Sequence, residues 1–322
     1  MNAPDFLPAD LDDALLVGRV WRPAPLDGPA VVAVRRGRLV DISAHASTVA
    51  GLLERSDAAA IVRGAPGEDL GDAAQLVQGA AAGPASGRAL RLLAPCDLQA
   101  IKACGLRPQD MDAGVKPDTD VVTKSQPMSA LGHGADIGLQ PATHAHTPEA
   151  GIVLAVNSLG LVVGAALGND IRLGDTGDDT GSCAIGPFIR LFDRRFTMDT
   201  LRRAEVHLRV DRADDGIVLT GASRMREIGR EPLDLVEQTC GHHHQYPDGF
   251  MLFLGTTCAP GADRGVGGAG FTHHPGDRVS ISAASLGTLV NTVRSSDGIV
   301  PWTYGARCLY ASLARRGLLA VA

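Results

Sequence analysis

The sequence predicts a β-rich α+β fold, with a small N-terminal α/β domain over residues 1–95 and a larger C-terminal domain over residues 96–322. Three observations lead to this expectation. Short apolar runs bounded by Gly, Pro, Asn and Asp recur along most of the chain. Apolar residues at helical spacing are confined to a few short segments. Strands and helices do not alternate regularly, so a doubly wound nucleotide-binding fold is not expected.

The N-terminal domain begins with strands. Within residues 14–42, the runs ALLVGRVW and AVVAVRRGRLVDI flank the loop PAPLDGP, and the second run turns back at Arg36-Gly37. Residues 47–55 have apolar side chains at helical spacing. The Ala- and Gly-rich stretch 58–88 predicts one short helix and a connecting loop.

The C-terminal domain is expected to begin with a loop, because residues 96–120 contain little that could pack. Paired antiparallel strands should follow, at 151–157 with 161–168 and at 204–210 with 216–220. Further strands are expected at 249–255 and 278–282, and helices at 200–204, 231–240 and 303–316.

Composition limits the class of protein. A net charge of -6 and a pI near 5.9 argue against a nucleic-acid partner, since binding to phosphates needs a basic surface. No apolar run reaches the length of a membrane span, and the acidic first residues lack the basic start of a signal peptide. Six scattered cysteines without a CxxC pair indicate reduced thiols, so we expect a cytoplasmic protein.

Seven blocks of sequence together resemble the fumarylacetoacetate hydrolase family, and within it the 2-keto-3-deoxy sugar acid dehydratases. The blocks follow the family's order and cover most of the chain: LVGRVWRP (16–23), VTKSQPMSALG (122–132), GIVLAVNSLGLVVGAALGND (151–170), SCAIGPFIRLFD (182–193), GHHHQYPDGFMLFLGTTCAP (241–260), GFTHHPGDRVSIS (270–282) and LGTLVNTV (286–293). The resemblance implies a small N-terminal domain followed by a mixed β-roll, usually in a homodimer. It also implies a 2-oxo acid or β-dicarbonyl substrate bound to Mg²⁺ or Mn²⁺.

The resemblance implies a metal site made of a Glu-x-Glu pair on one strand and a third acid at the end of the next. Residues i and i+2 of a strand face the same side, and such a cation prefers oxygen ligands. This sequence keeps the first acid as Glu149 and the third as Asp170, but Gly151 stands at the second position. We therefore expect Glu149 and Asp170 to bind Mg²⁺ or Mn²⁺ weakly or not at all.

Other parts of the family's site are also expected to be missing. Gly174 stands where the family has an arginine, and no lysine lies between Asp170 and Ser182. Upstream, Cys104-Gly105 leads almost directly into residues 106–110, where the family has a helical lid that carries its acid/base pair. Loss of the lid would remove the usual base and the element that excludes water.

Histidines offer two alternatives for replacing those groups. His144 and His146 would share a face of an extended strand and could complete a transition-metal set, or they could be loop histidines facing water. In the block 241–260, which does not bind the metal in the family, His243 could act as a general base or have a structural role. His133 could likewise face the pocket or lie in a solvated loop.

Three further residues match segments that line the family's pocket. By resemblance, Thr256 would donate a hydrogen bond to the substrate carboxylate, and Lys124 and Gln126 would face the cavity. A structural role for Lys124 is equally open, because burying a lysine is costly unless it is paired.

Three functions are therefore considered. The first is a repurposed lyase-type enzyme that catalyses elimination, cyclisation, isomerisation or decarboxylation, with Glu149 or Asp170 as base and little or no metal. The second is a non-catalytic protein that binds a ligand or a partner. The third is a conventional 2-keto-3-deoxy sugar acid dehydratase whose metal site is rebuilt with His144 and His146.

Overall fold

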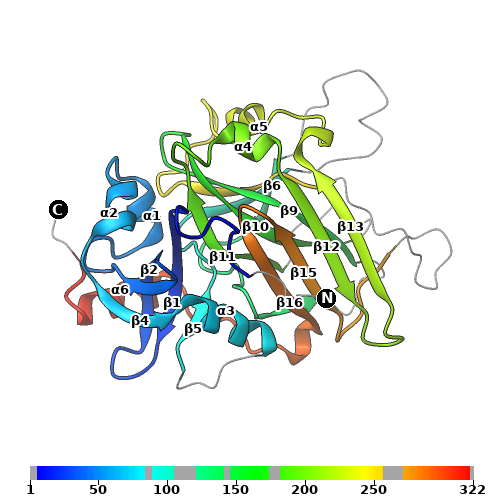
Figure 1. Ribbon diagram of the computed structural model, residues 1–322, viewed down its shortest axis with the longest axis horizontal. Helices are drawn as coiled ribbons and strands as arrows, with labels where there is room; N and C mark the ends of the chain where they lie inside the picture. Colours follow the sequence, from blue (N-terminus) through cyan, green and yellow to red (C-terminus); the bar gives the residue numbers. More distant parts are fainter. Residues whose placement is uncertain are drawn as a thin grey trace.

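The computed structural model describes residues 6–83, 89–104, 121–140, 146–173, 182–256 and 271–319. Two β-sheets dominate this part of the chain (Figure 1). The larger sheet has the order β4 (Glu68–Asp72), β3 (Arg38–Asp41), β2 (Gly28–Arg35), β1 (Leu16–Arg22), β11 (Cys183–Leu191), β10 (Val162–Leu173), β9 (His146–Val156), β14 (Phe250–Phe253), β6 (Ala100–Cys104) and β7 (Val121–Ser125), with β5 (Arg91–Leu93) paired to β1. The smaller sheet has the order β13 (Val218–Arg224), β12 (Glu205–Asp211), β15 (Arg278–Ala283), β16 (Gly287–Ser295) and β8 (Asp136–Leu139).

Short helices pack around the two sheets. Figure 1 shows α1, α2 and α6 beside the N-terminal strands, and α4 and α5 above the C-terminal ones. The helices are α1 (Val49–Leu53), α2 (Ala58–Gly64), α3 (Ala73–Ala82), α4 (Met198–Arg202), α5 (Pro232–Thr239) and α6 (Ala306–Arg315), with 3₁₀ turns at Met225–Glu227 and Ser296–Gly298. The β-rich α+β fold predicted from the sequence is confirmed.

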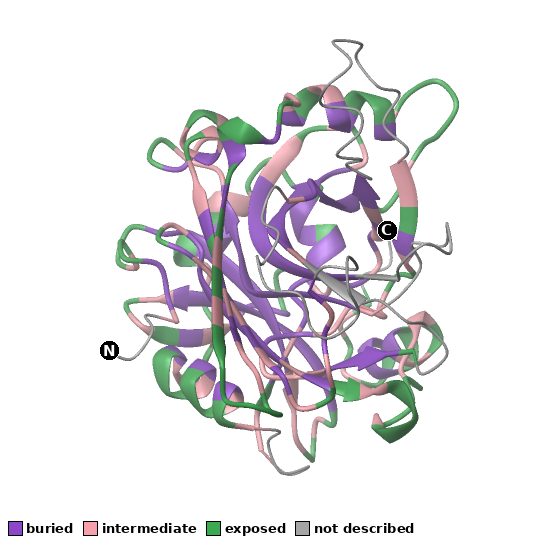
Figure 2. Cartoon of the chain, turned by 90° about the vertical axis from the view of Figure 1, so that its right-hand side faces the viewer, coloured by how far each residue is buried: buried purple, intermediate pink, exposed green. Residues whose placement is uncertain are grey.

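The hydrophobic core covers both faces of β9 and β10. Ile152 and Leu154 point from one face of β9 into a cluster shared with the smaller sheet. Val153 and Ala155 point from the opposite face into a cluster shared with β6, β14 and the helices α1 and α2. Figure 2 shows these central strands as almost continuously buried. Strands buried on both faces need apolar residues at successive positions, as the run Ile152–Val156 has.

The predicted antiparallel hairpins are present. β1 pairs with β2, β2 with β3 across Arg36-Gly37, β9 with β10, and β12 with β13. Arg36 and Gly37 both have positive φ, which is the conformation that such a tight turn requires.

Two expectations were wrong. The stretch 58–88 contains β4 and a second helix, α3, in addition to α2. The stretch 96–120 was expected to be a loop, yet Ala100–Cys104 forms β6, which pairs in parallel with β14. That pairing joins segments about 150 residues apart, so local sequence could not reveal it. The larger sheet crosses residues 95–96, since β1 pairs with β11, and the division at that point stays a prediction.

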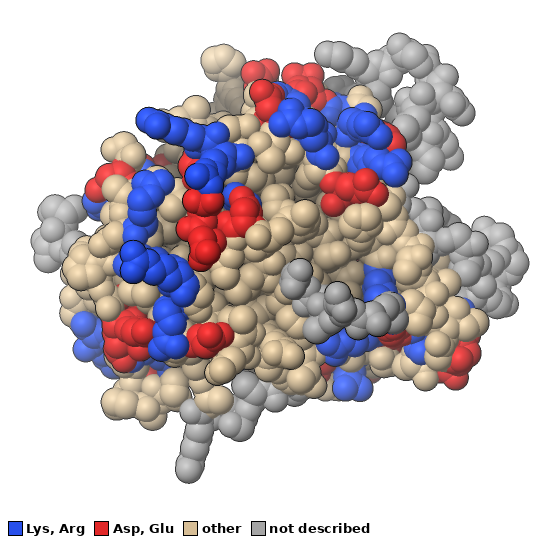
Figure 3. All heavy atoms as spheres, in the orientation of Figure 1, with Lys and Arg blue, Asp and Glu red and all other residues tan. Residues whose placement is uncertain are grey.

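The surface mixes charges of both signs. In Figure 3, Lys and Arg side chains lie beside Asp and Glu in several clusters, and wide uncharged areas separate these clusters. Several exposed ion pairs account for this pattern, such as Arg38–Asp69 and Arg224–Glu205. Among the helices that the structure describes, none is both long and apolar enough to cross a bilayer.

Candidate functional site

A row of three polar side chains crosses the middle of the larger sheet. Glu149 on β9 lies directly opposite Asp170 on β10, and Asp170 lies opposite Cys183 on β11. Residues that are directly opposite in an antiparallel pair project from the same face, with Cβ atoms about 5 Å apart. The half-buried Glu149 and the buried Asp170 are therefore neighbours, as the sequence predicted for the first and third acids.

Lys124 is brought to this row from β7, at the end of the same sheet. Its Nζ lies 2.5 Å from Asp170 Oδ1 and donates a hydrogen bond to the Ile171 carbonyl oxygen at 2.8 Å. Only 1% of the Lys124 side chain is exposed. Lys124 is thus a buried ion-pair partner of Asp170, and its role at a pocket stays a prediction.

The reach of Lys124 depends on the curl of the sheet and on a β-bulge. Opposite β7, Ile101 and Lys102 pair with Ser125 and Thr123, which leaves Lys124 as the extra residue. Bulges redirect a side chain in this way. Just after β7, Leu131 exchanges hydrogen bonds with the backbone of β11, so the sheet rolls round until this segment meets β11. The rolled sheet places β7 opposite β10.

Two glycines lie next to the two acids, and neighbouring atoms leave no room for a side chain at either of them. Gly151 on β9 pairs with Gly168 on β10, one step further along the same face. A Cβ on Gly151 would lie 2.7 Å from the Gly255 carbonyl oxygen, and a Cβ on Gly168 would lie 2.4 Å from the ring of Phe253. The segment that follows β14 therefore fills the place of the family's second acid, and the half-buried Thr256 comes directly after Gly255.

Two acids of the metal set that the resemblance implies are present in this row. Mg²⁺ prefers oxygen ligands in near-octahedral geometry and usually keeps several water molecules. Here the second acid's position is filled by a backbone carbonyl, and the third acid is already paired with a lysine. Within the described ranges, no group of three or more His, Cys, Asp and Glu side chains is placed to hold a metal ion.

Cys183 adds a thiol to the row, which the sequence analysis did not single out. Burial, and then the nearby Asp170 carboxylate, raises the pKa of the Cys183 thiol far above its ordinary value. A thiol held in its neutral form is a poor nucleophile, so its place in the row is as packing. In the sequence, the sign that Cys183 would be buried is its position at the start of a largely apolar run.

The other predicted site residues lie elsewhere. His243 is exposed in the segment between α5 and β14. Both ends of that segment meet the β9–β10 turn, since Cys240 lies beside Gly160 and Gly249 packs on Val156. Glu149 is seven residues back along β9 from Val156, or roughly 20 Å. The structure does not bring His243 to the acids.

Gln126 lies at the surface, and several other predicted site residues lie outside the described part of the chain. Gln126 is exposed, next to the end of β7. His144 lies outside the described residues, and only the backbone of His146 is described, at the start of β9. Gly174 and the segments expected to lack the lysine and the lid also fall outside the described residues. The roles proposed for these residues stay predictions.

His133 is buried, which is neither of the alternatives expected for it. Its Nδ1 accepts a hydrogen bond from the Val290 N–H, and its Nε2 lies 3.0 Å from the Val77 carbonyl oxygen. This pattern makes Nε2 the protonated nitrogen of a neutral ring. Burial lowers the pKa of His133 to about 4, so the histidine joins α3 to β16 in its neutral form.

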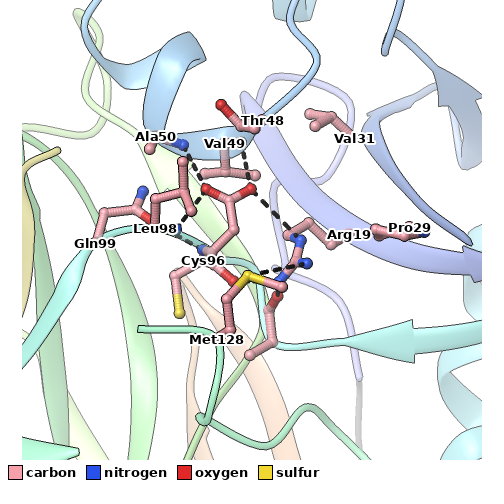
Figure 4. A network of polar contacts seen from close by, with 12 residues as sticks. Arg19, Pro29, Val31, Thr48, Val49, Ala50, Cys96, Leu98, Gln99 and Met128 are labelled. Atoms are coloured by element: carbon pink, nitrogen blue, oxygen red, sulfur yellow. Dashed lines mark hydrogen bonds and ion pairs between the residues drawn. The ribbon is translucent and has the colours of Figure 1, made fainter. Parts of the chain in front are cut away.

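A second buried ion pair supports the roll from its N-terminal side (Figure 4). Arg19 Nε on β1 lies 3.6 Å from Asp97 Oδ2, and Asp97 accepts hydrogen bonds from the backbone N–H groups of Val49, Ala50 and Leu98. Two of those groups are the first N–H groups of α1, which an acid stabilises. Figure 4 shows Met128, from the loop after β7, against the Arg19 guanidinium.

Comparison with known proteins concerns the fold. No family model matches the chain. A curated 2-dehydro-3-deoxy-D-arabinonate dehydratase from Saccharolobus solfataricus is 25% identical over 198 residues, which is 56% of this chain and 59% of that protein. The match therefore spans less than two thirds of the relative's length.

Solved structures match over more of the chain. A 2-keto-3-deoxy-D-arabinonate dehydratase complexed with magnesium and 2,5-dioxopentanoate has a TM-score of 0.70 and 17% identity, over 87% of this chain and 99% of that one. A 5-carboxymethyl-2-hydroxymuconate delta-isomerase from Mycobacterium smegmatis has a TM-score of 0.57 and 19% identity, with the same coverage. A fumarylacetoacetate hydrolase from Exiguobacterium antarcticum has a TM-score of 0.57 and 16% identity, again with that coverage.

These structures share one architecture although their sequences differ widely. The predicted resemblance is confirmed: the chain has the fold of the fumarylacetoacetate hydrolase family.

Proposed function

We propose that the protein is a lyase-type enzyme that acts on a small 2-oxo acid or β-dicarbonyl compound, with a weakened or absent metal requirement. The observation that carries the proposal is the placement of Glu149 beside Asp170 on one face of the roll. The fold is shared with dehydratases and an isomerase, whose reactions support this class by analogy.

The chemistry begins with removal of a proton next to a carbonyl group. Glu149 is the proposed base, because it is half-buried while Asp170 is buried and paired. Glu149 takes the proton from the carbon next to the 2-oxo group, and the C–H electrons move to the carbonyl oxygen as an enolate. The enolate then expels a leaving group or regains a proton elsewhere. Thr256, next to the close contact between Gly255 and Gly151, is proposed to donate a hydrogen bond to the substrate carboxylate.

The proposal is tested with a thermal-shift screen of 2-oxo acids and β-diketones, with and without Mg²⁺. A ligand that binds the folded state raises the melting temperature by mass action, and we expect this shift without metal. A turnover assay on the ligands that bind should show a loss of about 10²–10⁴-fold in Glu149→Gln, with the thermal shift retained. A screen in which no such compound shifts the wild-type protein would refute the proposal.

A non-catalytic ligand-binding protein is the second candidate. The observation that favours it is the buried pairing of Asp170 with Lys124, which ties up one of the two acids. Ligand binding without turnover, unchanged in Glu149→Gln, would support this candidate instead. A conventional dehydratase has less support, because it needs metal ligands from His144 and His146. The homodimer and the cytoplasmic location stay predictions.

A further inference from the structure

We infer that Lys124 is a built-in counter-ion of Asp170 that takes the place of a divalent metal ion, so that Glu149 and Asp170 do not form a working Mg²⁺ or Mn²⁺ site. The inference deepens the proposed function and rests on it for the choice of site. Its test needs no substrate, so the two can fail separately.

The first support is the position of the ammonium group. Lys124 Nζ is 2.5 Å from Asp170 Oδ1 and 2.8 Å from the Ile171 carbonyl oxygen. The exposed fractions of the two side chains are 1% and 6%. A cation is therefore already in contact with the carboxylate that the resemblance assigns to the metal. A divalent ion on the same carboxylate would lie within a few ångströms of the ammonium, where like charges repel strongly outside bulk water.

The second support is the lack of space for another acid. A Cβ on Gly151 would be 2.7 Å from the Gly255 carbonyl oxygen, which is closer than real Cβ atoms come. The atom in the way belongs to the backbone. It is held in place by the hydrogen bond that the Leu254 N–H donates to the Ile152 carbonyl oxygen and by the pairing of β14 with β9. Restoring a glutamate at position 151 would require the end of β14 to move. The missing ligand is thus part of the packing.

The third support is the charge balance of the row. Glu149 and Asp170 contribute two negative charges, and Lys124 contributes one positive charge. Without the lysine the two acids would offer a divalent ion two formal negative charges. With the lysine these three residues offer one, which weakens the attraction for a cation.

The β-bulge at Lys124 indicates that this contact is specific to the fold. The extra residue in β7 aims the side chain across the roll at Asp170. Lys102, on the adjacent strand β6, has a different partner, since its Nζ donates to Thr123 Oγ1. Lys102 is therefore a matched control: a nearby lysine that donates to a hydroxyl group.

The direct test is a Mn²⁺ titration of the wild-type protein, followed by electron paramagnetic resonance of free Mn²⁺. We expect no saturable site at millimolar Mn²⁺. One tightly bound Mn²⁺ per chain that is lost in Asp170→Asn would overturn the inference. This measurement needs only the wild-type protein and one conservative variant.

The second test removes the lysine charge. We expect Lys124→Met to lower the melting temperature and to bind Mn²⁺ saturably in the millimolar range, where wild type does not, because two close carboxylates then lack the lysine cation. Mn²⁺ should partly restore the melting temperature of this variant. Lys124→Met/Asp170→Asn should be more stable than the single variant without metal and should not respond to Mn²⁺. Lys102→Met should behave as wild type.

Each remaining outcome decides between the two proposals. If Lys124→Met is unstable and gains no Mn²⁺ response, the counter-ion inference is wrong. If 2-oxo acids bind wild type only when Mn²⁺ is present, the inference is also wrong while the substrate class stands. If no 2-oxo acid binds but the Mn²⁺ results are as expected, the proposed function fails and the counter-ion remains.

Discussion

The two buried ion pairs, Arg19–Asp97 and Lys124–Asp170, are similar in burial but differ in their surroundings. In each pair both side chains are 6% exposed or less. Asp97 accepts hydrogen bonds from three backbone N–H groups, and Arg19 donates a hydrogen bond to the Cys96 carbonyl oxygen. The pair therefore links β1, α1 and the segment around residues 96–98. Asp170 instead stands directly across from a second acid, Glu149.

This difference separates a structural pair from a candidate functional one. A buried carboxylate that accepts from backbone N–H groups of two segments and faces a guanidinium from a third fixes how those segments pack. Two acids side by side are unfavourable for stability, since like charges directly opposite on a sheet repel. Folds tolerate such strain mainly where it serves a site. The four predictions below test this contrast, from the largest expected effect on stability to the smallest.

Asp97→Ala should cause the largest loss of stability, about 3–5 kcal/mol, because it leaves Arg19 buried without its carboxylate. It also removes the acceptor for the first N–H groups of α1. Urea unfolding followed by circular dichroism measures the effect. Asp57→Ala, at the exposed pair with Arg55, is the control and should change stability far less. An Asp97→Ala midpoint equal to that of wild type would show that the pair is not structural.

Lowering the pH should reduce the free energy of unfolding through His133, a buried side chain that is neutral in the folded protein and, within the described part of the chain, forms no ion pair with an acid. Its folded pKa of about 4 lies below the ordinary value of 6.5, so the unfolded chain binds the proton more readily. This contribution is complete above pH 6.5 and is lost as the pH falls towards 4, by up to about 3 kcal/mol.

The His133 contribution is measured as the pH dependence of the unfolding free energy. His133→Gln should flatten the curve between pH 6.5 and 4, and His207→Gln, at an exposed position, is the control for the loss of a histidine. Equal slopes for wild type and His133→Gln would exclude His133 as the titrating group.

Gly151→Ala should destabilise the protein by about 1–3 kcal/mol, because the new Cβ meets the Gly255 carbonyl oxygen. Gly79→Ala in α3 is the matched control, since no atom lies within 4 Å of its Cβ position and a helical alanine is favoured over glycine by about 0.5–1 kcal/mol. Urea midpoints of both variants give the comparison. A stable Gly151→Ala would mean that position 151 can accept a side chain after all.

Glu149→Gln should have the smallest effect on stability, within about 0.5 kcal/mol, because the side chain is half-buried at the end of the row. Loss of one of two neighbouring negative charges should even favour the folded state slightly. Thermal unfolding at neutral pH measures this change. A large loss of stability would assign Glu149 a structural role like that of Asp97.

The elements that the sequence predicted well are those with local signals. The hairpins β2–β3, β9–β10 and β12–β13 each combine apolar runs with a turn of Gly, Asn or Asp, and all three are present. β6 was missed because AIKAC is short and lies in a polar stretch. It becomes a strand only through its pairing with β14.

The candidate site also combines a feature that the local sequence predicts with contacts that it does not predict. The hairpin that joins β9 and β10 has a nearly constant register, so the approach of Glu149 to Asp170 followed from the sequence pattern. The pairing of Asp170 with Lys124 did not, because it depends on a bulge and on the curl of a sheet whose strands come from distant parts of the chain. The role of Asp97 was hidden for the same reason, since its partners Arg19, Val49 and Ala50 lie 47–78 positions away along the chain.

The sequence by itself determined the β-rich class, the main hairpins, the family resemblance and the loss of an acid at Gly151, because period-2 patterns, turn residues and motif positions are properties of the local chain. Only the tertiary structure decided that a backbone carbonyl fills the place of that acid and that Lys124 reaches Asp170. The first contact depends on the pairing of β9 with β14, which come from distant parts of the chain. The second joins β7 and β10, which meet only after the sheet has rolled, and no local pattern encodes how far a sheet curls.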